Sequence, residues 1–134
     1  MNDPKIGIRI PVWTAVLYIA GSLVILPWTI YLGQSLPAHH IFRHWDIAWV
    51  GLDAGLLLSL LITGIMVIRR SLWVVLTSVA AGSLLVVDAW FDVMGAHHGH
   101  ELIQAIFAAL LLELPLAGLS FRLAYSTLQK AYER

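Results

Sequence analysis

Four apolar stretches alternate with short polar segments along this chain. Each is close to the roughly 20 residues that a helix needs to cross the hydrocarbon core of a bilayer. They predict helices at about 12–32, 46–68, 72–94 and 101–125. Short connections make neighbouring helices antiparallel. The pattern therefore predicts an all-α integral membrane protein with a single domain (1–134), folded as an up-down-up-down bundle of four transmembrane helices.

Positively charged residues are distributed unevenly over the segments between these stretches. Seven of the eight lie toward the chain ends or in the turn between the second and third stretches: Lys5, Arg9, Arg69, Arg70, Arg122, Lys130 and Arg134. Only Arg43 lies in a loop on the other side. Loops rich in Lys and Arg stay in the cytoplasm. We therefore expect a multi-pass protein of the cell membrane with both termini cytoplasmic and the loops 33–44 and 95–100 extracytoplasmic.

The composition agrees with a bilayer environment and narrows the function classes. Hydrophobic residues make up 60% of the chain and charged residues 12%, against about 25% charged in soluble domains. The formal net charge is zero and there is no basic run, so nucleic acid is not an expected partner. The absence of cysteine excludes disulfides and thiolate metal sites.

Acidic residues gather toward the predicted extracytoplasmic side, and three of them fall well inside predicted helices. At 1.5 Å per residue, Asp53 and Asp88 lie roughly 10 Å below that surface and Glu113 roughly 18 Å. A charged side chain at a helix centre costs at least about 2.5 kcal/mol. No Lys or Arg is predicted at the same depth. The carboxyls must therefore be protonated, share protons or hold a cation, unless they only form hydrogen bonds that hold helices together.

Helical spacing predicts that these carboxyls face one another. Asp88 and Asp92 are four residues apart and share a face. In the last helix a stripe of small residues, which is typical of a packed interior face, surrounds Glu113: Ala105, Ala109, Ala117, Ser120 and Ala124. In the second helix, Gly51 and Gly55 form a GxxxG pattern around Asp53. Pro115 has no N–H and frees a carbonyl one turn earlier, beside Glu113.

All six histidines lie in the two extracytoplasmic loops, so these loops are rich in histidine. Imidazole together with carboxylate suits zinc, copper or iron. The candidate metal ligands are Asp88, Asp92, His97, His98, His100, Glu101, His44 and Asp46. Histidine-rich tracts indicate metal only by composition. Haem is disfavoured because no histidine lies inside a predicted helix.

Tryptophans adjoin several of the acids, in the segments 44–53 and 88–92. The faces of aromatic rings stabilise positive charge, and an apolar wall favours the protonated form of a carboxyl that acts as an acid. Trp45, Trp49 and Trp90 are therefore candidate pocket walls for a lipid-like ligand. In that case Asp53, Asp88, Asp92 and Glu113 would be the catalytic residues.

Three functions remain open. The first is a buried acidic site in the outer half of the bundle that binds a divalent metal ion or protons. The second is a membrane-embedded enzyme, of isomerase or cyclase type, that performs acid–base chemistry on a lipid or isoprenoid. The third is an accessory subunit of a larger membrane complex, in which the buried acids meet basic residues of a partner. Transport is a further alternative, and because four short helices enclose little volume, a transporter would need to form a homodimer.

Overall fold

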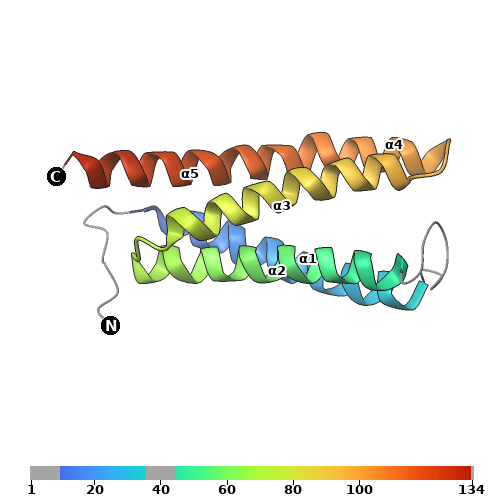
Figure 1. The fold of residues 1–134 in the computed structure, drawn as a ribbon, viewed down its shortest axis with the longest axis horizontal. Coiled ribbons are helices and arrows are strands. Elements are labelled where there is room, and N and C mark those ends of the chain that lie inside the picture. The colour runs from blue at the N-terminus through green and yellow to red at the C-terminus, as the bar shows by residue number, and fades with distance from the viewer. Residues whose placement is uncertain (1–9, 36–44, 134) are drawn as a thin grey trace.

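The computed structural model describes residues 10–35 and 45–133, and this part of the chain is helical and contains no β-strand. The first three helices are α1 (Val12–Ser35), α2 (Trp45–Arg69) and α3 (Val74–Gly95). The last helical run consists of α4 (His100–Ala108), one π-helical turn η1 (Ala109–Glu113) and α5 (Leu114–Tyr132), as Figure 1 shows. The predicted all-helical class is confirmed.

Four helices of the described chain are long and apolar enough to cross a membrane, with α4, η1 and α5 together forming the fourth. This is the architecture expected of a multi-pass membrane protein. The last helix extends to Tyr132, beyond the predicted end near residue 125. The apolar stretch ends near Arg122, but the residues that follow include Leu, Gln, Lys and Ala, which favour helix.

The closest backbone contacts between the helices follow their order along the chain. α1 packs on α2, α2 on α3, and α3 on α5 with η1 and α4. Figure 1 shows α3 lying between α2 and the last helical run. Within the described residues, no Cα atom of α1 lies within 8 Å of one in α4, η1 or α5. α1 and α5 therefore meet through side chains, with Tyr18 and Ala117 in one buried cluster, and not through close backbone contact.

The two halves of the bundle differ in charge. Near one end, Ala15 of α1, Val67 of α2 and Val74 of α3 form a buried cluster, against which Leu123 of α5 packs. We call this the basic half, because it holds Arg69, Arg70, Arg122 and Lys130. The opposite half, here the acidic half, holds Asp46, Asp53, Asp88, Asp92, Glu101 and Glu113.

Two glycines lie at close approaches between helices, Gly64 in the basic half and Gly82 near the centre of α3. A Cβ atom on Gly64 would lie 2.7 Å from Cγ1 of Ile19 in α1, and one on Gly82 would lie 3.1 Å from the Phe121 ring in α5. A Cβ atom on Gly51 would have no other atom within 4 Å. One on Gly55 would make an ordinary van der Waals contact with Leu84, at 3.9 Å. The GxxxG pattern around Asp53 therefore does not mark a close helix crossing.

Candidate functional site

Three carboxyls meet where α3 faces the π-helical turn. Asp88 and Asp92 lie one turn apart on α3, and Glu113 is the last residue of η1. One carboxylate oxygen from each of the three lies within 4.8 Å of the others. No other group of three acidic or histidine ligands this close occurs in the described chain. We call Asp88, Asp92 and Glu113 the acidic triad.

The π-helical turn arises next to a proline. The N–H of Leu114 donates to the carbonyl of Ala109, five residues earlier, instead of four as in an α-helix. Pro115 follows directly and has no N–H to donate in either register. A π turn inserts one residue into the helix and shifts the side chains that follow, and such turns are frequent at functional sites. Ala109 is buried at the start of this turn, and Glu113 ends it within the triad.

The triad is short of hydrogen-bond partners. Asp88 is only 8% exposed. Its Oδ1 and the Oε2 of Glu113 are buried and have no hydrogen-bond partner among the described residues. No Lys or Arg of the described chain forms an ion pair with any triad carboxyl. Three carboxyls this close cannot all be ionised in a low-dielectric interior without a counter-ion. The triad therefore requires protons or a cation.

Asp53 of α2 lies beside the triad without joining it. It is 3% exposed, and the hydroxyl of Thr29 in α1 is 3.4 Å from its Oδ2. The same hydroxyl is 3.0 Å from the carbonyl of Ile25, and its single proton can serve only one of the two acceptors. When ionised, Asp53 is near enough to interact electrostatically with each member of the triad. A fourth carboxyl thus adds negative potential to the same region.

The described histidines lie apart from the triad. His97, His98 and His100 are exposed at the turn between α3 and α4. Nδ1 of His97 is 3.1 Å from Oε2 of Glu101, one helical turn away. His44 and the other histidines of its loop, His39 and His40, lie outside the described residues. The ligand set predicted from sequence is therefore divided, with Asp88 and Asp92 in the triad and the described histidines at the surface.

The remaining predicted residues occupy separate places. Asp46 lies in the first turn of α2, with a buried Oδ1 that has no hydrogen-bond partner in the described part of the chain. Trp49 packs edge-on against Phe91, with ring centroids 5.9 Å apart. Trp90 is 65% exposed. The side chain of Trp45 lies outside the described part of the structure.

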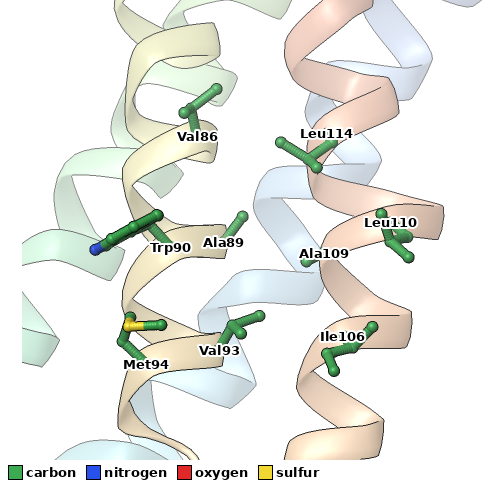
Figure 2. Close-up of a pocket in the computed structure, with 9 residues that line it drawn as sticks. All are labelled: Val86, Ala89, Trp90, Val93, Met94, Ile106, Ala109, Leu110 and Leu114. Atoms are coloured by element: carbon green, nitrogen blue, oxygen red, sulfur yellow. The ribbon is translucent and has the colours of Figure 1, made fainter.

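An apolar groove of about 300 Å³ runs beside the triad, between α3 and the last helical run. Figure 2 shows Ala89 and Val93 on α3 facing Ala109 and Leu114 across it. Trp90 also lines the groove, but no member of the triad does. A molecule in this groove would therefore meet apolar side chains rather than a carboxyl.

Two features of the site were missed from sequence. Thr29 gave only a weak signal, as one polar residue in an apolar stretch after Pro27. The π turn gave none beyond Pro115. No known protein family, curated protein or solved structure matches this chain. Function is therefore inferred from the geometry of the site.

Proposed function

We propose that this protein crosses the membrane four times, with both termini in the cytoplasm, and binds a divalent cation at the acidic triad. The proposal rests on one observation: three carboxylate oxygens lie within 4.8 Å of one another, two of the carboxyls having a buried oxygen without a partner in the described chain. A cation would supply the counter-charge that this arrangement lacks.

The distances favour a hard cation of moderate size. Calcium–oxygen bonds are about 2.3–2.6 Å long, so two oxygens up to about 4.8 Å apart can contact the same calcium ion. Magnesium–oxygen bonds of about 2.0–2.1 Å would require the most widely spaced oxygens to approach by less than about 1 Å. Oxygen-only ligands suit calcium, magnesium and manganese, whereas zinc and copper prefer imidazole or thiolate. We therefore place calcium and manganese ahead of zinc, copper and iron.

The number of negative charges in the triad exceeds what one divalent cation can balance. A divalent cation balances two of the three triad carboxylates, so the third retains a proton or leaves a net negative charge. Asp53 lies close by and adds to that charge. Cation binding should therefore be accompanied by proton release, because ligands must be deprotonated to bind metal.

Isothermal titration of the detergent-solubilised protein with Ca²⁺, Mn²⁺, Mg²⁺ and Zn²⁺ tests the proposal. We expect one site per chain for Ca²⁺ or Mn²⁺, with proton release that appears as a dependence of the heat on the buffer. Asp88→Asn keeps the shape of the side chain and should weaken binding at least about tenfold. Glu101→Gln is the matched control, because Glu101 is an exposed acid in the same half that lies outside the triad.

Two results would contradict the proposal. One is the absence of binding heat with all four cations, together with an unchanged thermal stability of the protein after Asp88→Asn. That result would favour the accessory-subunit alternative, in which basic residues of a partner neutralise the triad. The other is equal weakening by Glu101→Gln, which would move the site to the surface near His97.

A further inference from the structure

A second groove, of about 520 Å³, lies in the basic half, far from the acidic triad. It runs between the start of α1 and the later part of α5, whose backbones do not come within contact distance in the described structure. At its inner limit the hydroxyl of Tyr18 donates to Oγ of Ser120 at 2.8 Å. This hydrogen bond joins the two helices and leaves the space beyond it open.

The walls of this groove combine apolar and cationic side chains. Trp13 and Leu17 line it from α1, and Leu119 lines it from α5. Arg122 and Lys130 line the same wall of α5, two helical turns apart. Its volume lies within the range of about 300–1,000 Å³ that is usual for small-molecule sites. The groove therefore suits a ligand with an apolar body and an anionic head.

Helix length places the two cations at a membrane surface. Arg122 follows Glu101 by 21 residues in one helical run, about 31 Å at 1.5 Å per residue, which is the thickness of the hydrocarbon core. Lys130 lies about 12 Å further along the helix. Among the described residues, neither side chain forms an ion pair with a carboxylate. The charge of Arg122 is therefore available to a ligand at the headgroup level, and that of Lys130 lies just outside it.

We propose that this groove binds an anionic phospholipid of the leaflet next to the basic half. Its phosphate contacts Arg122, an acyl chain lies along Leu17 and Leu119, and Lys130, about 12 Å further along the helix, attracts the headgroup by its charge. Charge complementarity and the lateral opening between α1 and α5 favour a lipid over a soluble ligand, because a lipid enters sideways from the bilayer.

Lipid retention in native mass spectrometry tests this proposal. The protein is released from nanodiscs made of equal parts dioleoyl-phosphatidylglycerol and dioleoyl-phosphatidylcholine, which have the same acyl chains. We expect one retained phosphatidylglycerol per chain. A cation near an anionic lipid surface strengthens binding about fivefold, so Arg122→Gln or Lys130→Gln should each lower the preference about fivefold. Both together should lower it about 25-fold.

Arg70→Gln is the matched control. Arg70 is an exposed cation of the same half, but it does not line the groove, so its loss should leave lipid retention unchanged. Equal retention of the two lipids would overturn the proposal, as would an equal loss with Arg70→Gln, which indicates only general surface charge. A third overturning result is displacement of the lipid by millimolar inorganic phosphate, which would assign the cations to a soluble anion.

Discussion

The two halves of the bundle bury polar groups of different kinds. In the basic half the buried groups are hydroxyls, and they have partners: Ser78 donates to the carbonyl of Val74 at 2.6 Å, and Thr63 donates to that of Ser59 at 2.6 Å. In the acidic half the buried groups are carboxyls, and three of them (Asp46, Asp88 and Glu113) have an oxygen with no partner in the described chain. Hydroxyls that donate to their own helix are common in membrane helices, whereas unpaired carboxyls imply a ligand or protons.

The helices also differ in packing. Buried clusters join α1, α2, α3 and α5 around Tyr18, Leu60 and Val74. By contrast, α4 has no buried residue, and a Cβ added to Gly51 would touch nothing within 4 Å. Of the helices, α4 therefore contributes least to the buried interior. Gly51 is exposed, and Gly118 of α5 also meets no atom within 4 Å, so open positions of this kind are not confined to the acidic half.

The largest effect should come from the cation. A ligand at 100 times its dissociation constant stabilises the folded state by about 2.7 kcal/mol. We expect Ca²⁺ or Mn²⁺ to raise the melting temperature at neutral pH in proportion to the logarithm of its concentration. The effect should fade as the pH falls, because protonation of the carboxyls removes the ligands. Thermal unfolding in detergent, measured over a range of pH and cation concentration, gives this dependence.

Replacing a buried hydroxyl of the basic half tests whether the cation response depends on the triad alone or on any buried polar group. Ser78→Ala should leave the cation response unchanged, whereas Asp88→Asn should abolish it. The proposed division between the halves would be wrong if the cation stabilised both variants equally. It would also be wrong if stabilisation increased toward low pH.

The next effect concerns packing. Gly64→Ala places a methyl group 2.7 Å from Cγ1 of Ile19 and 3.2 Å from the carbonyl oxygen of Ala15. Overpacking of this kind costs about 1–3 kcal/mol. Gly51→Ala meets no atom and should leave the free energy of unfolding unchanged or raise it by up to about 1 kcal/mol, through helix propensity. Unfolding by a denaturing detergent compares the two, and equal effects would show that Gly64 does not lie at a close helix crossing.

The fold was largely predictable from sequence, because membrane-spanning helices depend on length and apolarity alone. The small-residue stripe was also predicted to face inward, and Ala109, Ala117, Ser120 and Ala124 are buried, whereas Ala105 is half-buried. The site was predictable only in part. Asp88 and Asp92 share a face by helical period, and the small-residue stripe predicted Glu113 on the inward face, where the triad lies. The π turn that ends at Glu113 is indicated by no periodicity. The close crossing at Gly64 rather than Gly51 depends on the neighbouring helix, which a single sequence does not specify.

The smallest effect should come from the one hydrogen bond that joins α1 to α5 among the described residues. In Tyr18→Phe the donor to Ser120 is lost, but the Ser120 hydroxyl still donates to the carbonyl of Leu116 at 2.8 Å. No donor is left without a partner, so the cost should be near the average of about 0.6 kcal/mol for hydrogen bonds between membrane helices. Unfolding in detergent measures this cost, and Ser120→Ala in a double-mutant cycle isolates the pair. Because Tyr18 and Ser120 lie outside the acidic triad, the cation affinity should not change. A tenfold loss of affinity in Tyr18→Phe would show that the two halves are coupled and that the hydroxyls belong to the site.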